Sequence, residues 1–229
     1  MTKQCQAKLI QISPLTNSII QIKLNPDIFI DYQSGQYLNI LLQEEALSFS
    51  IANAPLGGHY YELHIRHSGG DPYHQPLFAH LKQHGSCLIS LPFGECYLGN
   101  LDPQKPIVFI AGGTGFAPIK AMIEEMLAHD DSRQMMLFWG AREACDIYQQ
   151  QLVCQWQNHV KQFKVKTLLD NKKENLLVKE VLKTNKDFLS QAQFVISGPF
   201  PLVYSIRDQL VHHGLSANNM HSDAFAFEC

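Results

Sequence analysis

Hydrophobic positions follow one spacing in the first half of the chain and another in the second half. Up to about residue 98, short runs rich in β-branched and aromatic residues alternate with turn signals, among them residues 25–27, 34–35, 54–58 and 68–72. Six short strands at this spacing predict an antiparallel barrel or sandwich. The predicted strands cover residues 7–13, 18–24, 36–42, 48–53, 60–66 and 86–91, with one helix at 76–84.

Beyond residue 104, strand-like and helical patterns alternate. Predicted strands at residues 107–111, 135–139, 163–168 and 194–196 are followed by predicted helices at 117–128, 147–159, 176–183 and 201–213. This alternation predicts a parallel sheet with helices on its faces. We therefore expect two domains, a β-barrel over residues 1–101 and an α/β parallel-sheet domain over residues 102–229.

A glycine-rich turn follows the apolar run at residues 107–111. It consists of Gly112, Gly113, Thr114 and Gly115, and the next helix has Pro118 in its first turn. Glycines let the backbone approach a ligand closely, and the free N–H groups at a helix N-terminus favour an anion such as a phosphate. The spacing matches neither GxGxxG nor GxxxxGK[ST]. Taken alone, the turn fits nucleotide binding and an ordinary strand-to-helix turn equally well.

Two further strand ends carry unusual residues. Trp139 and Arg142 lie at the end of the second predicted strand of this half, and Gly198-Pro199-Phe200 follows the fourth. Ligands of open parallel sheets bind outside the carboxyl ends of the strands, where all three turns would meet. An extended phosphorylated ligand such as a dinucleotide suits this edge. Arg142 fits a phosphate contact or a plain surface position, and Trp139 fits a ligand contact or a core position.

Composition narrows the class of protein. The 229 residues are 45% apolar and 17% charged, with a net charge of −3 and no polybasic block, which argues against nucleic acid as a partner. No apolar run approaches the length of a membrane span, and residues 1–13 lack the apolar region of a signal peptide. We therefore expect a cytoplasmic protein with no membrane partner.

Cysteine and histidine spacing does not indicate a metal centre. The chain contains no CxxC pair and no iron–sulfur spacing, so reduced thiols are expected. His80 and His84 lie four residues apart on a predicted helix, but no third ligand stands at useful spacing, which favours a surface pair. The cysteines are Cys5, Cys87, Cys96, Cys145, Cys154 and Cys229.

Short sequence words along almost the whole chain resemble a known family. They are GQYL from residue 35, FSIAN from 49, ELHI from 62, LPFGECYL from 91, AGGTGFAP from 111, FWGAREACDIY from 138, ISGPF from 196 and DAFAF from 223. Together and in this order, they resemble the ferredoxin–NADP⁺ reductase superfamily, and within it the stand-alone NAD(P)H:flavin oxidoreductases. The resemblance implies a flavin-binding barrel followed by an NAD(P)-binding α/β domain, with the isoalloxazine ring between them.

The resemblance also implies roles for individual residues. Ser50 would lie near flavin N5, the atom that receives hydride, and Thr114 would approach both flavin and nicotinamide, so these two are the expected catalytic residues. The other expected flavin contacts are Leu47, Ser48, Phe49, His64, Ile65, Arg66 and Phe227. The expected NAD(P) contacts are Gly112, Gly113, Thr114, Gly115, Phe116, Trp139, Arg142, Gly198, Pro199 and Phe200.

One position departs from the family pattern. The family motif begins with an arginine that pairs with the flavin phosphate or ribityl chain, and Leu47 stands at that position. Leucine offers no bidentate donor. We therefore hypothesise that flavin is held weakly and behaves as a substrate, and that Arg66 takes over part of the missing role.

The function implied is hydride transfer from NADH or NADPH to riboflavin, FMN or FAD, with release of free reduced flavin. The partners would be small molecules and, through the reduced flavin, a flavin-dependent oxygenase or another acceptor. No plant-type ferredoxin cysteine set is present, and the two domains account for the length of the chain. Two alternatives stay open: an FAD-containing reductase subunit serving a separate oxygenase or ferredoxin, and a non-catalytic module that binds NAD(P)H.

Overall fold

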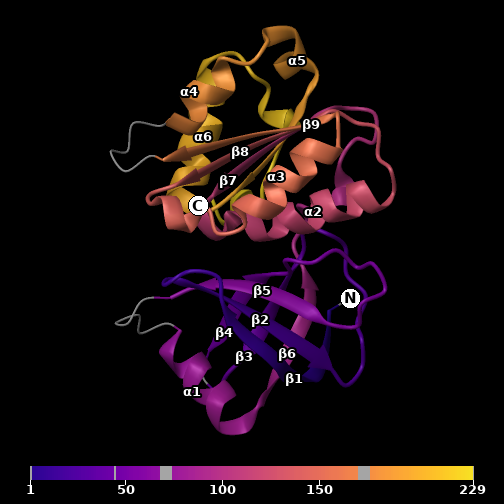
Figure 1. Ribbon diagram of the computed structural model, residues 1–229, viewed down its shortest axis with the longest axis vertical. Coiled ribbons are helices and arrows are strands. Elements are labelled where there is room, and N and C mark those ends of the chain that lie inside the picture. Colours follow the sequence, from indigo (N-terminus) through magenta and orange to yellow (C-terminus); the bar gives the residue numbers. More distant parts are fainter. Residues whose placement is uncertain (1, 44, 68–73, 170–175, 229) are drawn as a thin grey trace.

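The chain forms two lobes that follow one another in sequence. The computed structural model describes residues 2–43, 45–67, 74–169 and 176–228. The indigo-to-magenta lobe contains antiparallel strands, and the magenta-to-yellow lobe contains parallel strands (Figure 1). The turn predicted at residues 68–72 lies outside the described residues, as does Cys229. Among the described residues, no helix combines the length and apolar character needed to cross a bilayer.

The first lobe is a closed antiparallel barrel, as predicted. Its strands lie in the order β4-β3-β6-β1-β2-β5. A bridge between Ile51 and Leu63 joins the end of β4 to β5, and the Ala52 N–H donates to the Glu62 carbonyl at 2.7 Å. The elements are β1 (Lys3–Pro14), β2 (Ile19–Pro26), β3 (Tyr37–Leu41), β4 (Ala46–Ser50), β5 (Tyr61–Arg66), α1 (Gln75–His84) and β6 (Ser86–Phe93).

Strand β5 is buried on both faces. Side chains alternate across a strand, so Tyr61, Leu63 and Ile65 fill the barrel core. Glu62 and His64 point the other way and are nevertheless only 5% and 6% exposed, because the second lobe covers them. This strand therefore carries polar side chains into the interface between the lobes.

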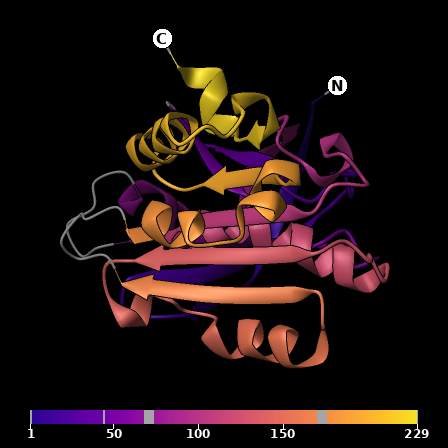
Figure 2. The same cartoon turned by 90° about the horizontal axis from the view of Figure 1, so that it is seen from above.

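The second lobe is a parallel sheet in the order β11-β10-β7-β8-β9, which confirms the predicted α/β class. Figure 2 looks down on this sheet and shows helices on both sides of it. Its strands are β7 (Ile107–Gly112), β8 (Met135–Ala141), β9 (Phe163–Leu169), β10 (Gln193–Ser197) and β11 (Met220–His221). Its helices are α2 (Phe116–Ala128), α3 (Gln150–His159), α4 (Leu176–Leu182), α5 (Lys186–Gln191) and α6 (Phe200–His212).

Alternate residues of β7 serve two separate cores. Ile107, Phe109 and Ala111 pack with residues of α2 and α3, whereas Val108 and Ile110 pack with residues of α4 and α6. This two-sided burial explains the unbroken apolar run that predicts the strand. Helix α2 also lies at the boundary with the barrel (Figure 1), so it is buried on more than one side.

Three details of the second lobe differ from the predicted pattern. Helix α3 begins at Gln150 rather than at 147, because Ile147 ends a 3-10 turn (Ala144–Asp146) and is buried in the core. The pattern predicts neither α5 nor the two-residue β11. The Asn185 side chain accepts from the N–H groups of Asp187 and Phe188 and so caps the N-terminus of α5.

Candidate functional site

Two turns meet at the carboxyl ends of β7 and β10. From β7 the chain continues to β8 and β9 on one side, and it later returns to β10 on the other side of β7. This reversal of strand order opens a crevice of the kind in which open α/β sheets bind ligands. The predicted glycine turn and Ser197-Gly198 border this crevice.

Gly115 is required by the close approach of these two turns. A Cβ at this position would lie 2.2 Å from the Ser197 carbonyl oxygen and 2.6 Å from the Gly198 nitrogen. Gly113 is glycine for a different reason, because its φ of 55° is in the left-handed region. The glycine pattern of the turn thus follows from backbone geometry.

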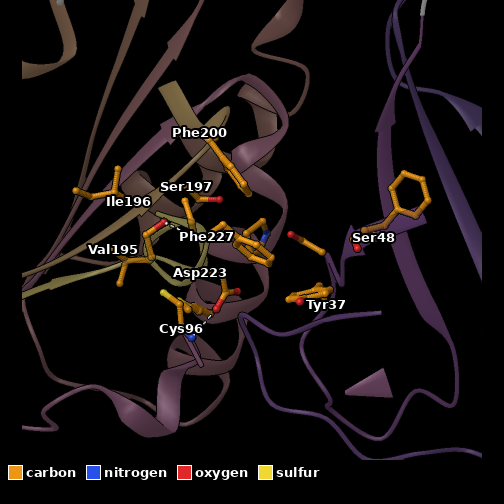
Figure 3. Close-up of a pocket in the computed structure, with 16 residues that line it drawn as sticks. Tyr37, Ser48, Cys96, Val195, Ile196, Ser197, Phe200, Asp223 and Phe227 are labelled. Atoms are coloured by element: carbon orange, nitrogen blue, oxygen red, sulfur yellow. Dashed lines mark hydrogen bonds between the residues drawn. The ribbon is translucent and has the colours of Figure 1, made fainter. Parts of the chain in front are cut away.

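A cleft of about 320 Å³ separates the barrel from this crevice, within the range of small-molecule sites. Figure 3 shows Tyr37 and Ser48 on the barrel side, facing Ser197, Phe200 and Phe227 on the other side. Its lining includes Tyr37, Ser48, Phe49 and Ser50 from the barrel and Pro118, Ser197, Gly198, Phe200, Asp223 and Phe227 from the α/β lobe.

Strand β4 presents hydroxyl groups to the cleft. Ser48, Phe49 and Ser50 line it, and the Ser48 Oγ donates to the Asn39 Oδ1 at 2.7 Å. Leu47 is half-buried against the barrel core and is not among the lining residues. The alternation of the strand therefore turns the side chain at the family's arginine position towards the core.

Two aromatic rings close the opposite wall. Phe227 and Phe200 stack with ring centroids 5.4 Å apart, and they remain 56% and 45% exposed. The Tyr204 hydroxyl donates to the Ala224 carbonyl at 2.8 Å, and the Arg207 guanidinium pairs with Glu228. These contacts hold the last described residues against α6, with Phe227 at the cleft.

Three expected flavin contacts on β5 do not line the cleft. Ile65 belongs to the barrel core, and His64 is bonded to the Tyr148 hydroxyl at 3.0 Å in the interface between the lobes. Burial lowers the pKa of His64, which keeps the imidazole neutral. The Arg66 Nη2 pairs with the Asp146 Oδ2 at 2.8 Å. Its Nη2 also lies 3.6 Å from a Cβ built at Gly113, so Arg66 borders the glycine turn.

Phe116 and Trp139 support the glycine turn from beneath. Both are fully buried, their rings stack at 3.9 Å, and neither residue lines the cleft. The Trp139 Nε1 donates to the Gly113 carbonyl at 3.0 Å and holds the turn. Thr114 is half-buried within the turn, whereas Arg142 and Pro199 are exposed at the ends of β8 and β10.

No metal site is found among the described residues, which contain no group of three or more His, Cys, Asp and Glu side chains suited to a metal ion. His80 and His84 form a ring pair on α1 with centroids 4.6 Å apart.

Residues 109–208 match the family model described as "Oxidoreductase NAD-binding domain". Among solved structures, the fold is similar to a ferredoxin–NADP⁺ reductase of Plasmodium falciparum, with a TM-score of 0.79, 16% identity and 95% of each chain covered. At this identity the likeness concerns the fold alone.

Sequence similarity decides the family. The chain is 30% identical over 230 residues to the CDP-6-deoxy-L-threo-D-glycero-4-hexulose-3-dehydrase reductase of Yersinia pestis, which covers 98% of this chain and 69% of that protein. The chain belongs to the ferredoxin–NADP⁺ reductase-like oxidoreductases. It is also 28% identical over 241 residues to the NAD(P)H-flavin reductase of Vibrio harveyi, covering 99% of this chain and 100% of that protein.

In this ferredoxin–NADP⁺ reductase-like chain, Tyr37 and Asp223 line the cleft but are not among the site residues expected from the sequence. Tyr37 stacks on Phe93 with centroids 5.5 Å apart. The Asp223 Oδ1 accepts from the N–H groups of Glu95 and Cys96 at 2.8 and 2.9 Å, and burial raises the pKa of its carboxyl group. Both residues stand in the family words GQYL and DAFAF, which were the available signal.

Proposed function

We propose that this protein transfers a hydride from NADH or NADPH to a flavin bound in the cleft. The observation that carries the proposal is the placement of the Ser48–Ser50 segment opposite Ser197-Gly198, the turn after β10 at the β7/β10 crevice. A hydroxyl-bearing strand on one side and a nucleotide-type crevice on the other suit two ring systems that must meet. The full-length similarity to an NAD(P)H-flavin reductase supports this reading.

The lining of the cleft fits a flavin. The Tyr37 ring offers flat apolar surface and the hydroxyls of Ser48 and Ser50 offer hydrogen bonds, whereas the Phe49 ring packs against the barrel core on the same face of β4 as Leu47. When bound, flavin and nicotinamide supply the hydride chemistry, from nicotinamide C4 to flavin N5. The protein contributes binding and orientation, and no strong acid or base is required.

Each expected residue then has a defined task. Ser50 would hydrogen-bond the flavin near N5 and help to hold the proton that follows the hydride, and Thr114 would contact both rings. The N–H groups of the glycine turn and the N-terminus of α2 would bind the nucleotide phosphates. Gly198, Pro199 and Phe200 would form the far wall of the nucleotide site, with Arg142 available to a phosphate at the end of β8.

Several wider assignments belong to the same proposal. The chain divides into domains after residue 101, in the connector between β6 and β7, where Leu98 and Leu101 already pack against the α/β core. The protein acts in the cytoplasm, and its flavin substrates include FMN. Its reduced flavin serves an oxygenase or another acceptor, a proposal supported by relatives that are named as reductase components of dioxygenases.

Ser50→Ala is expected to lower the rate of flavin reduction at least several-fold while the fold stays intact. Loss of one hydrogen bond of about 1 kcal/mol corresponds to about fivefold in rate. Stopped-flow reduction of added flavin by NADH measures the effect, and circular dichroism checks the fold. Ser190→Ala, which removes an exposed hydroxyl on α5, is the matched control. If Ser50→Ala reduces flavin at the wild-type rate, the proposed role of Ser50 is wrong.

The purified protein is expected to lose its flavin on gel filtration and to oxidise NADH only when riboflavin, FMN or FAD is added. Leu47 packs towards the barrel core, and the charge of Arg66 is already matched by Asp146. Position 47 therefore supplies no cation for a flavin phosphate, and the cation at position 66 is already paired with a carboxylate. Absorbance at 450 nm after gel filtration and a steady-state NADH assay test this expectation.

The same assay separates the alternatives. Stoichiometric FAD retained after gel filtration, with turnover that depends on an added protein acceptor, would support a reductase subunit with bound FAD instead. The absence of NADH and NADPH oxidation with every flavin would support a non-catalytic binding module and contradict the proposed function.

A further inference from the structure

A cluster of charged side chains is buried between the two lobes, outside the cleft. Lys120 on α2 and Glu62 on β5 are each only 5% exposed. Burying two charges is costly unless they are paired and fully hydrogen-bonded. The proposed site does not use either residue, so their position calls for another explanation.

The Lys120 ammonium group has three partners for its three protons. It donates to the Ala52 carbonyl at 2.9 Å, and it pairs with the Glu62 Oε1 at 3.3 Å and the Glu124 Oε1 at 2.8 Å. Ala52 and Glu62 belong to the barrel, whereas Lys120 and Glu124 belong to α2. One side chain therefore ties the two lobes together at a single point.

Glu62 is held as a carboxylate at this point. Burial alone would raise the pKa of Glu62, but the hydrogen bond from His64 and the charge of Lys120 lower it to about 2. His64 is neutral, so its Nε2–H donates to the Glu62 Oε1 at 2.9 Å and its Nδ1 accepts from the Tyr148 hydroxyl. The cluster thus combines three charged groups, Lys120, Glu62 and Glu124, with the neutral side chains of His64 and Tyr148.

The tie lies close to both halves of the proposed site. Ala52 follows Ser50 by two residues, about 7 Å of extended chain, and its N–H is bonded to the Glu62 carbonyl. Lys120 stands one helical turn after Phe116, where the turn Gly113–Gly115 ends and α2 begins. A shift at Lys120 would therefore move the β4 end relative to the glycine turn.

We propose that Lys120, through Glu62 and Ala52, is a positioning residue that sets the separation between the Ser50 strand and the glycine turn. The inference rests on the proposed hydride transfer between ligands held by these two elements. Hydride transfer requires the reacting atoms at near-contact distance, and a misplacement of about 1 Å costs on the order of a hundredfold in rate. Lys120 touches neither ligand in this role and acts by fixing geometry.

A purely structural role makes a different prediction. Replacing both members of a buried ion pair by uncharged residues is often neutral for stability, whereas removing one leaves an uncompensated charge. The double variant Lys120→Met/Glu62→Gln removes both buried charges, and Glu124, whose side chain is 26% exposed, keeps the Ala54 N–H as a donor, so stability is expected to recover without the three-way tie. Stability and hydride-transfer rate should separate in this variant if Lys120 is a positioning residue.

The experiment compares wild type, Lys120→Met, Lys120→Met/Glu62→Gln and the control Lys183→Met. The control removes an ion-paired lysine whose side chain is 68% exposed. We measure the single-turnover rate of FMN reduction by NADH, KM for NADH, the urea midpoint, and amide hydrogen exchange at Ala52 and Gly113–Gly115. In the double variant we expect a hydride-transfer rate at least tenfold lower, a KM within about threefold of wild type, and faster exchange at Ala52. Lys183→Met should match wild type.

The double variant decides the outcome even if Lys120→Met fails to fold. A hydride-transfer rate that returns to the wild-type value together with the urea midpoint would overturn the proposal, as would unchanged exchange at Ala52. If wild type itself reduces no flavin, the proposed function fails instead, and the exchange data still report whether the tie orders the two elements.

Discussion

Replacing Gly115 with alanine is expected to lower kcat/KM for NADH by about a hundredfold or more. The new Cβ would lie 2.2 Å from the Ser197 carbonyl oxygen and 2.4 Å from its carbon. These are backbone atoms of the neighbouring strand end, so they cannot rotate away as a side chain would. Relief requires the two turns to separate by about 1 Å, enough to cost on the order of a hundredfold in rate. Steady-state kinetics with NADH at saturating FMN measure the loss.

Two other glycines serve as controls for this substitution. Gly57→Ala places a methyl group where nothing lies within 4 Å, although φ is +82°, so it carries backbone strain of about 1 kcal/mol without a clash. Gly113→Ala adds similar strain within the turn itself, where only the Arg66 Nη2 lies near, at 3.6 Å. We expect Gly115→Ala to be far more harmful than either one. If kcat/KM of Gly115→Ala stays within threefold of the wild-type value, the turns after β7 and β10 are not tightly apposed.

Acid is expected to destabilise the fold in two successive ranges of pH. Burial lowers the pKa of His64 from its ordinary value of 6.5, so below pH 6.5 the unfolded chain binds a proton that the folded chain does not. The pKa of Glu62 falls from 4.5 to about 2. Its contribution is therefore complete above pH 4.5 and is lost as the pH falls towards 2.

The Glu62 contribution amounts to about 3 kcal/mol at neutral pH by linkage. Urea unfolding at pH 7.5, 6.0, 5.0, 4.0 and about 3 should show a falling free energy of unfolding, with the first decrease below pH 6.5. Glu62→Gln should be less stable than wild type by about 3 kcal/mol at pH 7.5, because Lys120 loses one of its two carboxylates. The two proteins should then converge as the pH falls below 4.5.

The pH series also tests the assignment of the charges. Tyr148, Lys120 and Glu124 face His64 and Glu62 across the interface, and Lys23 on β2 lies 3.9 Å from the Glu62 Oε2 within the barrel. An unfolding free energy that stays constant between pH 7.5 and 5.0 would mean that His64 is not held neutral. A constant difference between wild type and Glu62→Gln down to pH 4.0 and below would mean that the Glu62 carboxylate is not stabilised.

The fold was largely predictable because local patterns and tertiary structure agree. The continuous apolar run at residues 107–111 becomes a strand buried on both faces, and the short alternating runs become barrel strands. The errors occur where tertiary contacts override the pattern. Ile147 continues a helical spacing in sequence but is buried as the end of a 3-10 turn, and β11 is a two-residue strand with no pattern of its own.

The site was predicted less completely, and β5 shows why. The word ELHI reads as a flavin-contacting strand by resemblance, yet Ile65 faces the barrel core and His64 faces α2 and Tyr148. Which face of a strand meets the other lobe depends on how the lobes dock, and this is not encoded in the spacing. Ser50 and Gly198, in contrast, line the cleft because they lie at the ends of strands. For the parallel sheet, the order of strands and helices along the chain already indicates that ligands bind at the carboxyl ends of the strands.

Helix α2 has a consequence for recombination between relatives. Nine of its 13 residues are buried, and Lys120 reaches across to Ala52 and Glu62. By sequence this helix belongs to the C-terminal half, but one of its faces is complementary to the barrel. A chimera that joins the barrel of one homologue to the nucleotide-binding half of another therefore inherits a mismatched helix. Exchange of the barrel together with the barrel-facing positions of α2 is the crossover that preserves this complementarity.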